Sequence, residues 1–132
     1  MKRLFLLAVL LALAAPAAAS AAGAELRVTY WPEGRGSGTP LRWTLRCEPA
    51  GGSLPRAADA CRKLGAMSRP FAVPPKDRVC TEIYGGPQEA IVAGTHAGRR
   101  IWIKLGRSNG CEIARFHRLR FLVPGFVGGG TT

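Results

Sequence analysis

The sequence predicts a small α+β domain in which one amphipathic helix lies on one face of an antiparallel sheet. Three features of the 132 residues predict this fold. Apolar and polar residues alternate in several short segments, which is typical of half-buried strands. In one segment the apolar residues instead recur about every 3.6 residues, which is the period of a helix. Four cysteines indicate that disulfides crosslink the domain.

The first 24 residues have the layout of an export signal. Lys2 and Arg3 precede an apolar run, Leu4 to Ala15, that is too short to anchor the chain in a bilayer. Small residues follow, and Ala22-Gly23-Ala24 is the preferred cleavage site. We therefore expect a secreted, extracellular protein without a membrane anchor. Its expected parts are a signal peptide at 1–24, one domain at 25–124 and a flexible tail at 125–132.

The chain is strongly basic. Its formal charge is +11, and +9 remains once Lys2 and Arg3 leave with the signal. Such a balance favours anionic partners, but it is also common among soluble exported proteins. Because export removes the chain from most nucleic acid, we expect no nucleic-acid partner.

The first strands are predicted to form a hairpin. Leu26, Val28 and Tyr30 alternate with polar residues, and the segment 41–47 repeats this alternation. The residues between the two segments are rich in glycine, as in a turn. The two strands should therefore pair antiparallel.

A second hairpin is predicted from residues 90–94 and 101–105, around a turn at 95–98. A short helical turn is expected after Cys111. Three alternating apolar residues then suggest a last strand: Leu119, Phe121 and Val123.

One helix is predicted between the hairpins and ends near Ala66. Ser53 is expected to cap it, and Pro55 suits its first turn. Its apolar stripe has helical spacing and should cover the sheet. The stripe consists of Leu54, Ala57, Ala58, Cys61 and Leu64.

The even number of cysteines predicts two disulfides, for which three connectivities exist. Cys47 ends a predicted strand and Cys61 lies on the inner side of the predicted helix, so their pairing is the most economical. That pairing leaves Cys80 with Cys111. Because no spacing has the close C-x-x-C form, we expect neither a metal site nor a cofactor.

The second face of the predicted sheet is cationic. It would carry Arg27, Trp31, Arg42, Arg46, Arg100, Trp102 and Lys104. Arginines interleaved with tryptophans can bind single-stranded nucleic acid or other polyanions. We favour the plainer interpretation, a solvated face or a subunit contact.

A segment without periodicity lies between Pro75 and Pro87 and is clamped at Cys80. A loop held in this way loses little conformational freedom when it binds, which a protease inhibitor requires. The same stiffness also suits a purely structural connection.

Several short motifs resemble the Streptomyces subtilisin inhibitor family, and their order and spacing match along residues 25–123. They are Cys47-Glu48-Pro49, Gly51-Gly52-Ser53-x-Pro55, Cys61, Cys80-Thr81-x-Ile83-Tyr84 and Ser108-Asn109-Gly110-Cys111. The resemblance implies a five-stranded antiparallel sheet with two helices on one face, and the same two disulfides. It also implies a standard-mechanism inhibitor of an extracellular serine protease, which binds as a substrate that is cleaved very slowly.

The resemblance places the reactive bond between Glu82 and Ile83, with Asn109 as support for the loop. A turn-forming Asn-Gly pair is the alternative interpretation of Asn109. The residues expected to contact the protease beside the bond are Val79, Cys80, Thr81 and Tyr84.

Glu82 departs from the family pattern, since inhibitors of subtilisin-like enzymes usually have a non-acidic residue there. The target is therefore either a glutamate-specific endopeptidase or a subtilisin-like enzyme held through the flanking strand contacts. The family's dimer packs sheet faces together, and the arginines expected on that face disfavour it. A homodimer stays an open alternative.

Catalysis by this chain is not expected, because His96 and His117 lack the spacing of any catalytic motif. The alternative to an inhibitor is a non-inhibitory secreted binding module of the same fold. Its basic Arg and Trp surface would then bind polyanions or another protein.

Overall fold

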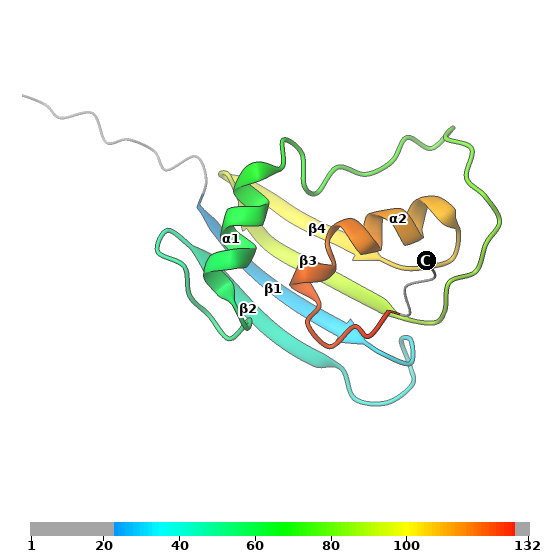
Figure 1. Ribbon diagram of the computed structural model, residues 1–132, viewed down its shortest axis with the longest axis horizontal. Helices are drawn as coiled ribbons and strands as arrows, with labels where there is room; N and C mark the ends of the chain where they lie inside the picture. Colours follow the sequence, from blue (N-terminus) through cyan, green and yellow to red (C-terminus); the bar gives the residue numbers. More distant parts are fainter. Residues whose placement is uncertain (1–22, 129–132) are drawn as a thin grey trace, which may run out of the picture.

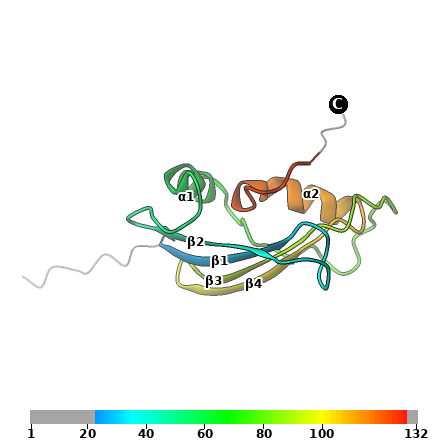
Figure 2. The ribbon, with the colours of Figure 1, turned by 90° about the horizontal axis from the view of Figure 1, so that it is seen from below.

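Four antiparallel strands form one sheet in the order β2-β1-β3-β4, and two helices lie together on one of its faces (Figures 1 and 2). This arrangement is seen in a computed structural model that describes residues 23–128. The strands are β1 (Ala24–Trp31), β2 (Leu41–Cys47), β3 (Glu89–His96) and β4 (Arg99–Leu105). The helices are α1 (Ala57–Ala66), α2 (Gly110–Arg118) and the short 3-10 turn η1 (Arg120–Leu122).

Both predicted hairpins are confirmed. On β1, Val28 lies opposite Trp43 of β2 on one side and Val92 of β3 on the other. Alternate residues of the strands therefore share a face, and those directed toward the helices are largely buried. The strand β1 starts at Ala24, which pairs with both Cys47 and His96. Gly23 is described too, and the remaining residues of the expected signal peptide, 1–22, lie outside the described residues.

The prediction of a fifth strand is wrong for the described part of the chain, because its residues form the end cap of α2 and the 3-10 turn η1 instead. Leu119, Leu122 and Val123 are fully or almost fully buried, whereas Phe121 is only partly buried. Spacings of three and four residues direct these side chains to one side of a helical turn. The Leu122 N–H donates to the Leu119 carbonyl at 2.9 Å, which closes that turn. The alternation of apolar residues at 119, 121 and 123 was therefore misleading.

The helix α1 begins later than the sequence predicted, because Ser53 is bound to β2. The Thr44 N–H donates to Ser53 Oγ at 2.9 Å, and the Ser53 N–H donates to Thr44 Oγ1 at 3.1 Å. The cap position is Arg56 in the left-handed conformation (φ 56°), without a side-chain hydrogen bond. Ala58, which was expected in the apolar stripe, is exposed.

The two disulfides join Cys47 to Cys61 and Cys80 to Cys111, with Cα atoms 5.6 and 5.4 Å apart. The predicted connectivity is confirmed. The first disulfide ties α1 to the end of β2, and the second ties the segment before β3 to the first turn of α2.

The helix α2 is held on the sheet by aromatic packing. Phe116 is fully buried, with ring centroids 6.5 Å from Tyr30 and 4.8 Å from Phe126. Phe126 falls in the range expected to be a flexible tail, yet its ring covers Phe116, so the packed part of the chain extends beyond residue 124. Residues 129–132 lie outside the described part.

The uncovered face of the sheet carries the basic residues that the sequence placed there. In the paired registers, Arg27 and Arg46 alternate with core residues, and Trp102 lies opposite Ala93 on the same face. Trp102 is 65% exposed. Figure 2 shows that both helices lie on the opposite side. Between residues 23 and 128, no helix has both the length and the apolar character needed to cross a membrane.

Replacing Phe116 by alanine is expected to lower the free energy of unfolding by about 3–5 kcal/mol, because it leaves a cavity between the sheet and α2. Chemical denaturation of Phe116→Ala and of the parent protein measures this difference. Val127→Ala is the control, since that side chain is 95% exposed and should change the midpoint little. Equal midpoints for all three proteins would contradict the described packing.

Candidate functional site

The segment 79–84 presents apolar side chains to solvent. Val79 is 94% exposed, Ile83 58% and Tyr84 69%. Thr81 and Glu82 between them are exposed as well, and no helix or strand includes this segment. Figure 1 shows it within the long connection that passes the first turn of α2. Because large apolar residues are seldom clustered in solvent without a partner, this segment is the candidate binding site.

The segment is fixed to α2 at its N-terminal side. The Cys80–Cys111 disulfide joins it to the helix, and the Gly110 N–H donates to the Thr81 carbonyl at 2.9 Å. A Cβ atom at Gly110 would overlap Thr81 Oγ1, so glycine allows the two backbones to approach this closely. The backbone of Thr81 is therefore held in place before any partner binds.

A second fixed point follows the exposed side chains. The Gly85 N–H donates to the Arg107 carbonyl at 2.7 Å. A Cβ atom at Gly85 would lie 2.8 Å from Ile113 Cδ1, so this glycine also permits a close contact with α2. Between the two fixed points, residues 82–84 form no backbone hydrogen bond with the described residues. They are free to pair with the backbone of a partner.

Asn109 caps the helix α2, whose first turn carries Gly110 and Cys111. Its Oδ1 accepts from the Glu112 N–H at 3.0 Å, and its backbone is extended. Among the described residues, the Asn109 side chain has no hydrogen bond to residues 80–84. Asn109 thus orients Gly110, which in turn binds Thr81, and direct support of the loop by Asn109 stays a prediction.

Three supporting residues were not predicted from the sequence: Gly85, Arg107 and Gly110. The guanidinium of Arg107 lies 5.0 Å from the Phe126 ring, and its Nη1 donates to Gln88 Oε1 at 3.0 Å. These contacts fix Arg107, whose backbone carbonyl accepts the hydrogen bond from the Gly85 N–H. The glycines beside the candidate loop, in Gly85-Gly86-Pro87 and Asn109-Gly110, were the available signals.

Each of the two histidines packs edge-to-face against a phenylalanine ring. His96 contacts the edge of Phe71 at a centroid distance of 5.2 Å, and His117 contacts Phe126 at 5.8 Å. Within the part of the chain that the structure describes, no three metal-binding side chains gather.

Comparison with known proteins matched the chain to one family model and to solved structures, one of which is described here. The family model described as "Subtilisin inhibitor-like" matches residues 16–109, which is more than half of the chain. The solved structure is the complex of Streptomyces caespitosus sermetstatin with Bacillus licheniformis subtilisin. One of its chains is 28% identical, with a TM-score of 0.48, over 79% of this chain and 99% of that one. No curated protein matches.

Replacing Gly110 by alanine is expected to loosen the segment 79–85, because the added methyl group would overlap Thr81. Losing a hydrogen bond worth about 1 kcal/mol predicts several-fold faster amide exchange there. Hydrogen exchange with mass spectrometry on peptides that cover residues 78–88 measures it. The control is Gly106→Ala, since no atom lies within 4 Å of a Cβ built at Gly106. Equal protection in both variants would contradict the role of Gly110.

Proposed function

Because this chain belongs to the subtilisin inhibitor-like family, we propose that it is a secreted inhibitor that binds an extracellular serine protease through residues 79–84. The supporting observation is that most of these residues are exposed and that residues 82–84 lie between two fixed points. An ordered, substrate-like segment loses little conformational entropy when an enzyme binds it. In this proposal the inhibitory domain spans residues 25–124 and the signal peptide, residues 1–24, is removed on export.

The proposed reactive bond joins Glu82 to Ile83. Thr81 directs its carbonyl to Gly110, so the neighbouring backbone groups at Cys80 and Glu82 remain for pairing with the enzyme as an added strand. The Glu82 carbonyl oxygen would then enter the oxyanion hole, where the catalytic serine faces the carbonyl carbon. Ile83 and Tyr84 would occupy the leaving side.

The two fixed points explain why cleavage would be slow and reversible. Attack by the serine joins the Glu82 carbonyl carbon to the enzyme as an ester and releases the amine of Ile83. Thr81 is held by Gly110, and Gly85 is held by Arg107, so the new amine stays beside the ester. A neighbouring amine has a high effective concentration, and its attack on the ester re-forms the peptide bond.

Glu82 determines which proteases fit best. Its side chain is exposed and forms no ion pair among the described residues. Placing a carboxylate in an apolar pocket costs several kcal/mol, whereas a cationic pocket would favour it. We propose that subtilisin-like enzymes are still inhibited through the strand contacts, and that a glutamate-specific endopeptidase is the alternative target.

The uncovered sheet face supports a second candidate, a binding module without inhibitory activity. Its arginines and tryptophans lie together on one face, and the like charges disfavour a homodimer formed through it. Binding to a polyanion that weakens steeply with salt would favour this candidate.

The proposal is tested by incubating the mature protein with subtilisin-like, trypsin-like, chymotrypsin-like and glutamate-specific serine proteases. Residual activity is measured at increasing ratios of inhibitor to enzyme. We expect stoichiometric inhibition of the subtilisin-like or the glutamate-specific enzyme. Full activity of all four enzymes, together with retained binding to polyanions, would replace the inhibitor by the binding module.

Replacing Glu82 by methionine is expected to tighten binding to a subtilisin-like enzyme by about tenfold or more, because no charge then enters an apolar pocket. Binding to a glutamate-specific enzyme should weaken. Inhibition constants of Glu82→Met and of the parent protein measure both changes. Glu33→Met is the control, since Glu33 is an exposed acidic residue in the turn after β1. If neither constant changes, the reactive bond lies elsewhere.

A further inference from the structure

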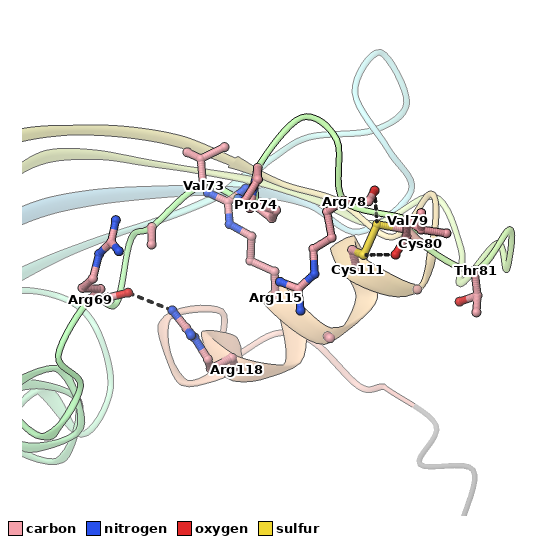
Figure 3. A pocket seen from close by; sticks show the side chains of 14 residues that line it. Arg69, Val73, Pro74, Arg78, Val79, Cys80, Thr81, Cys111, Arg115 and Arg118 are labelled. Carbon is pink, nitrogen blue, oxygen red and sulfur yellow. Dashed lines mark hydrogen bonds between the residues drawn. A yellow bond between two sulfur atoms is a disulfide. The ribbon is translucent and has the colours of Figure 1, made fainter.

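A hollow of about 690 Å³ lies between the segment 69–81 and helix α2 (Figure 3). Its lining includes four arginines and no aspartate or glutamate. Three other pockets of the described residues also contain cationic side chains, but each has at least one acidic residue in its lining. The four arginines of this hollow are Arg69, Arg78, Arg115 and Arg118.

Arg115 is the buried member of this group, with a side chain that is only 9% exposed. Its Nη1 donates to the Lys104 carbonyl at 3.2 Å and lies 4.0 Å from a carboxylate oxygen of Glu112. Its Nε and Nη2 are shielded from solvent and have no hydrogen-bond partner among the described residues. Burial lowers the pKa of Arg115, the Glu112 carboxylate opposes this shift and the nearby Arg118 adds to it, although a guanidinium keeps its proton at neutral pH. Two of the three guanidinium nitrogens of this buried cation therefore have no acceptor among the described residues.

Arg118 is fixed at the rim of the same hollow. Its Nη2 donates to the Arg69 carbonyl at 2.9 Å and to the Pro70 carbonyl at 3.1 Å. Figure 3 shows the bond to Arg69 and the arginine side chains around the opening. The remaining N–H groups of Arg118 have no acceptor among the described residues. The guanidinium is therefore already oriented for a further acceptor.

The walls of the hollow add positive charge in two further ways. Arg69 and Arg78 are exposed and take part in no ion pair of the described residues. Gly110 and Cys111, in the first turn of α2, also line the hollow, and the N-terminus of a helix carries partial positive charge. Arginine forks bind tetrahedral oxyanions through paired hydrogen bonds, and the volume suits a small molecule.

We propose that this hollow binds a compact, multivalent oxyanion of the phosphate class. The ligand binds the exposed arginines Arg69 and Arg78 together with Arg118, lies in the field of the buried Arg115, and so links the segment 69–78 to α2. Binding does not depend on the proposed reactive bond, because neither Glu82 nor Ile83 lines the hollow.

Calorimetric titration of the mature protein with pyrophosphate at low salt tests the proposal. We expect one site, weakened by added sodium chloride because salt screens the charges. The double variant Arg69→Gln, Arg78→Gln should bind at least about tenfold more weakly, since it removes two charged hydrogen-bond donors from the hollow. Thermal denaturation of each variant verifies that it is folded.

The matched control is the double variant Arg42→Gln, Arg46→Gln, which removes the same charge from the uncovered face of the sheet. It should bind pyrophosphate within about twofold of the parent protein. Equal weakening in both double variants would show attraction by net charge alone and would overturn the proposal. So would the absence of pyrophosphate binding.

A titration with long-chain polyphosphate distinguishes a free anion from the phosphate groups of a polymer. If the hollow takes a free anion, polyphosphate gains no affinity per phosphate group over pyrophosphate. If it takes the end of a polymer, both bind and both are weakened by Arg69→Gln, Arg78→Gln. Binding of polyphosphate without pyrophosphate, or binding weakened only by Arg42→Gln, Arg46→Gln, would contradict the compact site.

Discussion

Helix α2 holds the exposed loop through the Cys80–Cys111 disulfide and through the hydrogen bond from the Gly110 N–H to the Thr81 carbonyl. The helix is itself held on the sheet, because Phe116 is buried between Tyr30 and Phe126. The position of the loop therefore depends on packing in the core. Since the Gly85 N–H binds the carbonyl of Arg107 just before α2, both ends of the exposed residues share one support.

The charged residues are distributed unevenly over the molecule. Asp59, the acidic residue of α1, accepts from Lys63 at 3.0 Å, and this bond holds the pKa of Asp59 below its ordinary value. Many arginines have no such partner among the described residues. They gather on the uncovered sheet face and around the hollow behind the loop, where charge repulsion is relieved by solvent or by an anion.

The sequence predicted the two hairpins because one face of each strand is buried, and burial leaves a clear alternation of residues. It did not predict the start of α1, since the partner of Ser53 is Thr44 on the preceding strand β2, a contact that no helical or alternating pattern reveals. The false last strand had a different cause. Three alternating apolar residues also fit a turn of helix, and packing of Leu119 and Leu122 decided between the two.

The candidate loop was found from the cysteines and prolines around it, which are local features of the sequence. Its second fixed point could not be found in this way, because the bond from Gly85 to Arg107 joins residues that only the folded chain brings together. For the same reason, the cluster formed by Arg69, Arg78, Arg115 and Arg118 was not foreseen. Short-range patterns reveal the elements, whereas these contacts depend on how the elements pack.

Mass spectrometry of the mature protein during long incubation with an equimolar subtilisin-like protease tests the central claim most directly. We predict a single slow cut between Glu82 and Ile83. The two fragments should remain one molecule until reduction, because the Cys80–Cys111 disulfide spans the cut. A first cut outside residues 79–84, or rapid degradation into many fragments, would contradict the claim that this loop is held as a reactive site.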